Sequence, residues 1–259
     1  MTISAIIITK NEERNIGRCL ASLDGIADEV IVVDSGSTDR TGEICRDHGA
    51  TFVFHRWEGY SEQKNYANGL AHCEWILSVD ADEALSPTLR QSILRLKKEG
   101  ARTDTVYRMN RLTNYCGRFV RHCGWYPDSK IRLWPTGLAS WEGVVHEELH
   151  FELPPRFATL HGDLLHYSYY SITEHSDRQN HYAMLAAKKL HSQGRRVTTF
   201  AIALKSSWTF VRDFYLRLGF LDGFTGYAIC RFNAHYTFMK YSRLRELNKT
   251  ERLSDKQKV

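Results

Sequence analysis

Apolar residues in the first part of the chain alternate between strand-like runs and helix-like spacing. Ile3–Thr9 and Glu29–Asp34 are short, β-branched apolar runs of the kind that form buried strands. Between them, from position 16 to 23, apolar residues recur at three- and four-residue intervals, as one face of a helix requires. A second helix is predicted over 41–48 and a third strand over Thr51–Phe54. Strand and helix in alternation predict a parallel α/β sheet.

Polar residues follow these strands where a parallel sheet binds its ligands. Thr9 and Asp34 end the first two strands, and a further apolar run, Trp75–Val79, leads into Asp80 and Asp82. Ligands of open α/β sheets lie at the carboxyl ends of the strands. Alternation puts the two aspartates on the same side of the chain, where a hard cation such as Mg²⁺ would offset their like charges. A solvated acidic turn is the alternative interpretation of this pair.

Three motifs in this region resemble the nucleotide-sugar half of family-2 inverting glycosyltransferases. They are Thr9–Glu12, Val33–Asp39 and Val79–Glu83, and their order and spacing match over roughly the first hundred residues. The resemblance implies the GT-A fold, a Rossmann-like, mostly parallel sheet flanked by helices. It also implies an enzyme that uses a UDP-sugar donor together with Mg²⁺ or Mn²⁺.

The same resemblance assigns roles to residues of the first two motifs. It implies that Thr9 and Asp34 hold the base and the ribose of the nucleotide. Asn11 and Glu12, from the first motif, are expected in the same donor site.

The third motif and a nearby helix would complete the donor site. The resemblance implies that Asp80 lies near the ribose and the metal, and that Asp82 coordinates the metal on the diphosphate. Lys64, on a helix predicted over 61–72, matches the family's basic or polar position facing the diphosphate. A diphosphate needs positive charge beyond one divalent ion. An ordinary solvated lysine is the alternative interpretation of Lys64.

The middle third contains a motif that points to different chemistry. Residues 146–150 match H-E-x-x-H, the helix signature of zinc proteases. Zinc binding would need a continuous helix that places His146 and His150 on one face. Gly143 before the motif favours extended chain, and Pro154 ends any helix about one turn after it. Both features argue against the helix that zinc binding needs. A zinc metallohydrolase is kept only as an alternative function.

The same segment supplies the candidate general base. Family-2 relatives with a similar Trp-x-Gly-x-Val-His-Glu segment place it on the acceptor side, and an inverting transferase needs one base to deprotonate the attacking hydroxyl. Glu147 is the candidate, and His146 is expected to orient it or to bind metal or phosphate. Many relatives carry the base in a Glu-Asp pair followed by an aromatic residue, which this chain lacks. The rival carboxylates are Asp128, Glu142 and Glu148.

The last ninety or so residues change in character. A helix is predicted over 171–192, and aromatic residues then interleave with basic ones from Thr199 to Tyr241. Helices of this composition suit an anionic membrane surface. Packing on the catalytic domain or on another subunit is the alternative, and the oligomeric state stays open.

The segment Leu218–Tyr227 extends the resemblance to the lipopolysaccharide inner-core β-glucosyltransferase group. That resemblance implies UDP-glucose as the donor and a heptose of a lipid-linked core saccharide as the acceptor. The enzyme would then be cytoplasmic and peripheral on the inner face of the cytoplasmic membrane.

Composition agrees with this picture. The chain has 259 residues, a length that is enough for one large domain or one and a half. Its net charge is +5. We predict a nucleotide-sugar-binding half over 1–100, an acceptor-side half of the same domain over 101–170, and a helical extension over 171–259. No signal-peptide pattern or membrane-spanning run is apparent. No fold signature supports a nucleic-acid partner, and a non-catalytic nucleotide-sugar or lipid-binding module is the remaining alternative.

Overall fold

The computed structural model describes residues 1–143 and 147–257 and divides the chain into two compact units. The first unit carries the sheet and the second carries the long C-terminal helices. The first comprises Met1–Leu112 and Pro127–Tyr167, and the second comprises Thr113–Tyr126 and Ser168–Val259.

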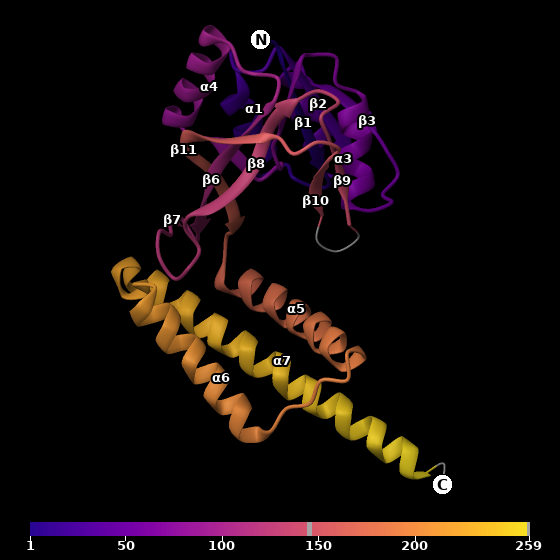
Figure 1. Ribbon diagram of the computed structural model, residues 1–259, viewed down its shortest axis with the longest axis vertical. Coiled ribbons are helices and arrows are strands. Elements are labelled where there is room, and N and C mark those ends of the chain that lie inside the picture. Colours follow the sequence, from indigo (N-terminus) through magenta and orange to yellow (C-terminus); the bar gives the residue numbers. More distant parts are fainter. Residues whose placement is uncertain (144–146, 258–259) are drawn as a thin grey trace. The chain divides into compact units, whose positions relative to one another are not determined.

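Parallel strands joined by helices form the N-terminal part of the first unit (Figure 1). The strands are β1 (Ile3–Thr9), β2 (Glu29–Asp34), β3 (Thr51–Phe54) and β4 (Trp75–Ser78), in the order β3-β2-β1-β4. The helices between them are α1 (Ile16–Leu23), α2 (Thr41–Asp47) and α3 (Tyr60–Gly69). The predicted alternation is confirmed, with α3 ending at Gly69 rather than near His72.

Antiparallel strands extend this sheet beyond β4. β8 (Asp128–Pro135) pairs with β4 and with β6 (Thr105–Tyr115), and β11 (Arg156–Tyr169) pairs with β5 (Glu83–Leu85). The order among the described strands is β3-β2-β1-β4-β8-β6-β11-β5. The predicted α/β class, with helices flanking the sheet and a helical extension after it, is confirmed.

The strands β9 (Ala139–Glu142) and β10 (Glu148–Phe151) lie outside this strand order. They form a separate antiparallel pair. Helix α4 (Pro87–Glu99) follows β5, and its start is well defined because the Ser86 hydroxyl accepts a hydrogen bond from the Leu89 amide while Pro87 occupies the first turn.

Alternation along β1 sends side chains into two apolar cores, one on each face of the sheet. Ile3, Ala5 and Ile7 pack in the core that α1, α2 and α4 cover. Ile6 packs on the opposite face with Trp134 and with Ala67 of α3. Because both faces are covered, the parallel strands read as nearly continuous apolar runs in the sequence.

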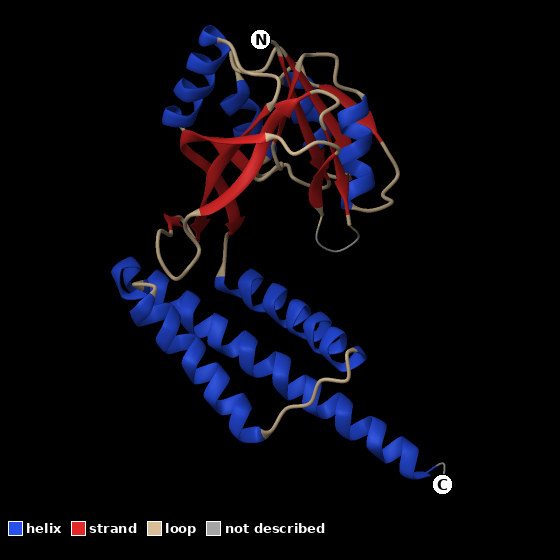
Figure 2. Ribbon diagram, viewed as in Figure 1, coloured by secondary structure: helices blue, strands red, loops and turns tan. Residues whose placement is uncertain are grey.

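Three long helices make up most of the described part of the second unit (Figure 2). The Ser171 and Thr198 hydroxyls cap the first two by accepting hydrogen bonds from backbone amides three residues on. The elements are α5 (Ile172–Ser192), α6 (Thr199–Val211), the π turn η1 (Arg212–Leu216), the 3-10 turn η2 (Gly219–Asp222) and α7 (Gly223–Gln257).

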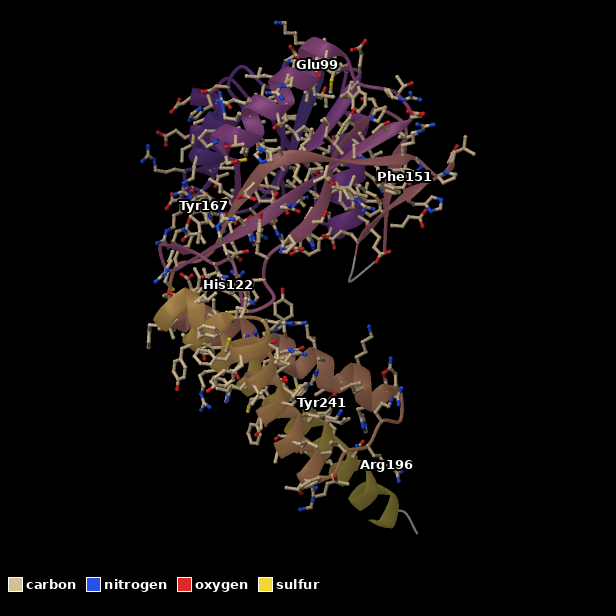
Figure 3. All side chains as sticks on the ribbon, turned by 60° about the vertical axis from the view of Figure 1, so that its left-hand side comes forward. Glu99, His122, Phe151, Tyr167, Arg196 and Tyr241 are labelled. Carbon is tan, nitrogen blue, oxygen red and sulfur yellow. The ribbon has the colours of Figure 1, made fainter. Side chains whose placement is uncertain are left out.

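The segment 113–126, which includes β7 (Arg118–Phe119), belongs with these helices. Val120 and Cys123 are buried in one core with residues of α7. The His122 ring Nδ1 lies 3.0 Å from Asp222 Oδ1, and the His122 amide donates to the same carboxylate. His122 is labelled in Figure 3. The sequence pattern predicts this segment in the acceptor-side half, because nothing local shows which core its apolar residues join.

Gly162 should be irreplaceable where β11 passes the start of α4. Its φ is +104°, and a Cβ there would lie 2.7 Å from the Leu89 Cα and closer still to the Leu89 amide nitrogen. We expect Gly162→Ala to lower the free energy of unfolding by at least about 2 kcal/mol, from backbone strain together with the clash. Urea denaturation measures the loss.

Gly100→Ala is the matched control for this substitution. Gly100 has a similar φ of +87°, but a Cβ there meets no atom within 4 Å. The control should lose only about 1 kcal/mol, the cost of the conformation alone. Equal losses for the two variants would show that the close approach to α4 contributes nothing.

Candidate functional site

The first two strands end side by side, as expected. Thr9 lies opposite Asp34 in the parallel register of β1 and β2, and both are buried. The Asp34 carboxylate accepts hydrogen bonds from the Gly36 and Ser37 amides and from the Ser37 hydroxyl. It therefore shapes the turn after β2. Within the described structure the Thr9 hydroxyl is buried and has no hydrogen-bond partner.

Asn11 and Glu12 tie the loop after β1 to its neighbours. Asn11 has a positive φ of 54°, and its side-chain oxygen accepts a hydrogen bond from the Thr38 amide at 2.8 Å. The Glu12 amide donates to the Thr41 hydroxyl at 2.8 Å, and the Glu12 carboxylate accepts from the Asn15 side chain. Both residues thus hold the loop after β1 to the loop between β2 and α2 and to the start of α2, at the edge where the nucleotide is expected.

A lysine from α3 joins two predicted site residues that are far apart in the sequence. The Lys64 ammonium lies 3.6 Å from Asp80 Oδ1 and 3.4 Å from Glu147 Oε1. It also lies 4.4 Å from the centre of the Trp141 ring. The Lys64 side chain is nearly buried, so this is not the solvated surface lysine of the alternative interpretation.

The charges continue from Asp80 along the antiparallel strands. Arg132 Nη2 lies 2.6 Å both from Asp80 Oδ2 and from Glu83 Oε1. Arg111 lies 3.6 Å from the same Glu83 oxygen and 2.7 Å from Asp128. Acidic and basic groups therefore alternate in an unbroken series, in the order Glu147, Lys64, Asp80, Arg132, Glu83, Arg111, Asp128.

Burial and neighbouring positive charge shift the pKa values of the two carboxylates beside Arg132 in opposite directions. Burial opposes the charge of Asp80, but Arg132 and Lys64 outweigh it and hold the pKa of Asp80 well below its ordinary value. At Glu83, burial dominates and raises the pKa despite the attraction of Arg132. Arg132 itself stays charged, since the two carboxylates raise its pKa against the effect of burial.

Asp82 has a different environment from Asp80. Its Oδ2 lies 3.2 Å from the Nε2 atom of His166 on β11. Both side chains are partly exposed, Asp82 to 25% and His166 to 14%. No cluster of three or more acidic, histidine or cysteine side chains suited to a metal occurs in the described residues. A metal here would therefore take its other ligands from substrate and water.

Two side chains of α3 fix the segment that leads to Glu147. The Asn65 amide group donates to the Trp141 carbonyl at 2.8 Å and accepts from the Trp141 amide at 2.7 Å. The Ser61 hydroxyl donates to the Gly143 carbonyl at 2.6 Å. The helix that supplies Lys64 thus also positions the strand before Glu147.

The structure does not place the remaining predicted residues beside Lys64. Asp128 is held by Arg111 and by Lys130, which lies 3.0 Å away. Glu142 is exposed on β9, one residue after the inward-facing Trp141, so it points away from Lys64. His146 lies outside the described residues.

The zinc-protease motif does not have the helix that it needs. Glu148–Phe151 is a strand, β10, which pairs with β9. His150 therefore lies on an extended segment, and the zinc metallohydrolase alternative loses its structural basis.

Sequence reasoning missed two side chains of this site. Neither Arg132 nor His166 is among the residues predicted for the site from the sequence. Both lie on strands that reach the site through tertiary pairing, β8 against β4 and β11 against β5. A buried arginine in an apolar strand was the one available signal, because such a residue needs acidic partners.

Comparison with known proteins identifies the family. The model of glycosyl transferase family 2 matches residues 4–134. An uncharacterised glycosyltransferase of Rickettsia typhi is 32% identical over 95% of this chain and 87% of its own length. The chain belongs to glycosyl transferase family 2. The lipopolysaccharide core biosynthesis glycosyltransferase LpsC of Rhizobium meliloti is 26% identical to this glycosyltransferase, over 94% of the chain and 92% of LpsC.

Solved structures give weaker likenesses. TarS of S. aureus, crystallised with UDP-GlcNAc, aligns over 98% of this glycosyltransferase and 92% of the TarS chain with a TM-score of 0.47 and 17% identity. Glucosyl-3-phosphoglycerate synthase of Mycobacterium tuberculosis, crystallised with Mn²⁺ and UDP, aligns over 44% of each chain with a TM-score of 0.36 and 22% identity. These similarities are too low to carry an argument about function.

Replacing Arg132 should destabilise the first unit in a pH-dependent way. Arg132→Met leaves the buried Glu83 and the partly exposed Asp80 without their cation, which should cost about 3–5 kcal/mol at neutral pH. The pKa values of Asp80 and Glu83 should both rise in the variant. An acid whose pKa is raised by folding stabilises the folded state as pH falls, so part of the loss should be recovered in mild acid.

Urea denaturation at neutral and mildly acidic pH measures both effects, with Arg132→Lys as a charge-conserving control. A Met variant as stable as the parent at neutral pH would contradict the proposed role of Arg132. So would a loss that grows as the pH is lowered.

Proposed function

We propose that this family-2 glycosyltransferase transfers a sugar, with inversion, from a UDP-sugar to a lipid-linked saccharide. The observation that carries the proposal is the convergence of Lys64, Asp80 and Glu147 next to Asp82, at the carboxyl ends of the parallel strands. That edge is where α/β sheets bind nucleotides. The resemblance of the strand-end motifs to donor-binding residues supports Thr9, Asn11, Glu12 and Asp34 as the nucleotide contacts.

The residues near Asp82 fit a divalent metal. Asp82 and His166 supply one oxygen and one nitrogen donor, which leaves positions for phosphate oxygens and water, as Mg²⁺ or Mn²⁺ requires. Both Asp80 oxygens are engaged, by Arg132 and Lys64, so Asp80 is the weaker metal ligand. A bound ion would offset the charge that develops on the departing diphosphate.

Lys64 is placed to assist the same diphosphate. It is a nearly buried cation that lies between two carboxylates rather than in one close ion pair. Its two distances, 3.6 and 3.4 Å, are both long for charged partners. An incoming phosphate can therefore take up part of its charge without breaking a tight pair.

Glu147 is the carboxylate best placed to act as the base. Inversion requires that the acceptor hydroxyl attack opposite the leaving diphosphate while its proton passes to a nearby group. The Glu147 carboxylate is partly exposed and lies within reach of the diphosphate side through Lys64. Asp128 is committed to Arg111 and Lys130, and Glu142 faces the other way.

The acceptor and donor sugar follow from resemblance. The similarity to LpsC favours a core saccharide of lipopolysaccharide, and the segment Leu218–Tyr227 favours glucose as the transferred sugar and heptose as the acceptor. The reaction would then take place on the cytoplasmic face of the inner membrane.

A donor screen tests the proposed function. Purified protein is supplied with UDP-glucose, UDP-galactose, UDP-GlcNAc and GDP-mannose, with and without core saccharide, and nucleotide release is measured. We expect acceptor-dependent release of UDP. Binding of a UDP-sugar without turnover on any acceptor would favour the non-catalytic module instead.

Removing the metal ligand should abolish turnover without unfolding the protein. We expect Asp82→Asn to lower kcat at least about 100-fold, because a neutral amide is a poorer ligand for Mg²⁺ or Mn²⁺. His166→Gln should lower it as well, with partial rescue at high Mn²⁺. Asp47→Asn, at an exposed position on α2, is the control. Full activity in EDTA would rule out a role for the metal.

Removing the base should affect turnover and spare donor binding. Glu147→Gln keeps the shape of the side chain but not its proton affinity, so kcat should fall about 10²–10⁴-fold. UDP affinity, measured by calorimetry, should change little. If Glu147→Gln stays active while Glu142→Gln, Glu148→Gln or Asp128→Asn is inactive, the base is the rival carboxylate.

A further inference from the structure

Helix α6 exposes an apolar stripe along its whole length. Phe200, Leu204, Trp208 and Val211 recur at intervals of four, four and three residues, which places them on one helical face. All four are exposed, Phe200 to 76% and Trp208 to 54%. An isolated exposed apolar side chain is ordinary, but a row of this length on one helix needs an explanation.

The stripe leads into an aromatic cluster at the turn between α6 and α7. Aromatic rings contact one another there. The centre of the Phe214 ring lies 5.1 Å from that of Tyr215 and 6.2 Å from that of Phe220. Tyr215 and Phe220 are exposed, as are Leu216 at 65% and Phe224 at 72%. The stripe and this cluster together form one apolar surface on the second unit, here called the apolar face.

The charge around the apolar face is strongly one-sided. Between positions 195 and 249 the sequence holds ten Lys and Arg residues against three Asp and Glu residues. Two of the three acids are buried and paired, Asp213 with Arg212 and Arg217, and Asp222 with His122. The surface next to the apolar face is therefore positive.

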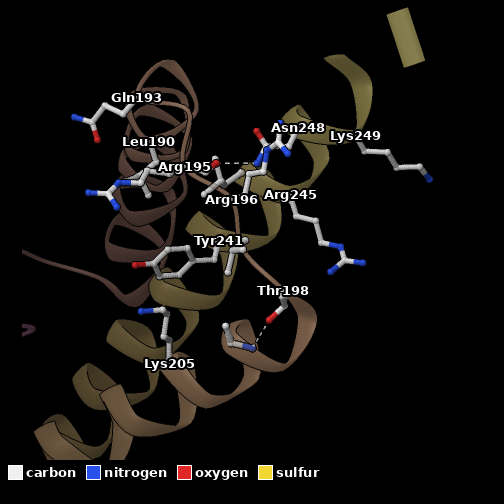
Figure 4. Close-up of a pocket in the computed structure, with 13 residues that line it drawn as sticks. Leu190, Gln193, Arg195, Arg196, Thr198, Lys205, Tyr241, Arg245, Asn248 and Lys249 are labelled. Carbon is white, nitrogen blue, oxygen red and sulfur yellow. Dashed lines mark hydrogen bonds between the residues drawn. The ribbon is translucent and has the colours of Figure 1, made fainter. Parts of the chain in front are cut away.

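Part of that positive charge lines a cavity of about 920 Å³ between α5, α6 and α7 (Figure 4). None of the described residues that line it is acidic. Its basic residues are Arg195, Arg196, Lys205, Arg245 and Lys249.

The basic region borders directly on the stripe. Trp208 and Lys205 line a second cavity together with Lys240, and Lys205 also lines the first. The two cavities are together called the basic groove, and Trp208 is the side chain of the stripe that lines it. Lys205 and Lys240 lie 5.4 and 4.8 Å from the centre of the Tyr241 ring. Burial and the charge of Lys205 lower the pKa of Lys240. These cations thus gather where an anion would relieve their repulsion.

We propose that the apolar face enters the surface of an anionic lipid bilayer, with the neighbouring basic groove holding lipid phosphates. Apolar and aromatic side chains beside Lys and Arg are the pattern of helices that lie in a membrane interface. The choice of a bilayer rests on the proposed lipid-linked acceptor, whereas the apolar face and its charge do not depend on it. No helix among the described residues is long and apolar enough to cross the membrane.

The charge distribution favours a bilayer over a second copy of this chain. A two-fold dimer would bring identical surfaces together, and the basic residues around the apolar face would then repel each other. A layer of anionic headgroups has the complementary charge. We therefore expect the chain to bind anionic lipid as a monomer through this face.

Vesicle co-sedimentation of the full chain tests the proposal. We expect binding to vesicles of phosphatidylglycerol and phosphatidylethanolamine at low ionic strength, and little binding to phosphatidylcholine. Phe200→Ser/Trp208→Ser/Phe224→Ser should weaken binding at least about tenfold. The matched control removes three exposed apolar side chains elsewhere, with Leu153→Ser/Tyr182→Ser/Leu185→Ser, and should bind normally.

A charge series separates the basic groove from the apolar face. Arg195→Gln/Arg196→Gln should weaken binding about fivefold for each charge removed. Arg95→Gln/Lys98→Gln, which removes two exposed charges from α4, should have little effect. Every variant should keep the UDP affinity of the parent, because no predicted donor-site residue is changed. Parent protein that fails to bind UDP would refute the proposed function and leave the vesicle result standing.

Three results would overturn the membrane proposal. One is a parent chain that does not sediment with anionic vesicles at low ionic strength. Another is equal binding by the apolar-face variant and its control. The third is a dimer in sedimentation analysis that the Phe200, Trp208 and Phe224 substitutions dissociate, without any binding to vesicles.

Discussion

One buried guanidinium holds the candidate site together. Arg132 is 4% exposed and lies 2.6 Å from both Asp80 and Glu83. Without it, the buried Glu83 and the partly exposed Asp80 would lie side by side with too little positive charge, a cost of about 3–5 kcal/mol. Because Arg132 balances Asp80 from one side, Lys64 is not locked to Asp80 and can also reach Glu147. The antiparallel strand β8 therefore sets the electrostatics of a site whose other residues lie mostly on the parallel strands and on α3.

This arrangement gives the two aspartates of the strand-end motif different tasks. Asp80 belongs to the series of alternating charges and keeps a low pKa. Asp82, two residues further along in the turn after β4, meets His166 instead. In the proposed reaction Asp80 positions the cations of the protein, whereas Asp82 faces the substrate. The two side chains are identical, so the difference in role comes from their neighbours.

The parallel strands and their helices could be predicted from the sequence because each is a local pattern of apolar spacing. The strand-end residues followed from the same pattern, since parallel strands end at one edge. Arg132 and His166 could not be placed, because their strands reach the site only through long-range antiparallel pairing. The pairing of segment 113–126 with the helices has the same origin. The aromatic and basic character of the helices was visible in the sequence, but only the structure separates buried rings from exposed ones.

The central claim is that Asp82 and His166 form half of a metal site that the nucleotide diphosphate completes. Titration of Mn²⁺ into the protein, followed by electron paramagnetic resonance of the free ion, tests it directly when done with and without UDP. Two protein ligands alone should hold Mn²⁺ weakly, and UDP should raise the affinity at least about tenfold, with metal raising UDP affinity by the same factor. Equal Mn²⁺ affinity with and without UDP would contradict the account.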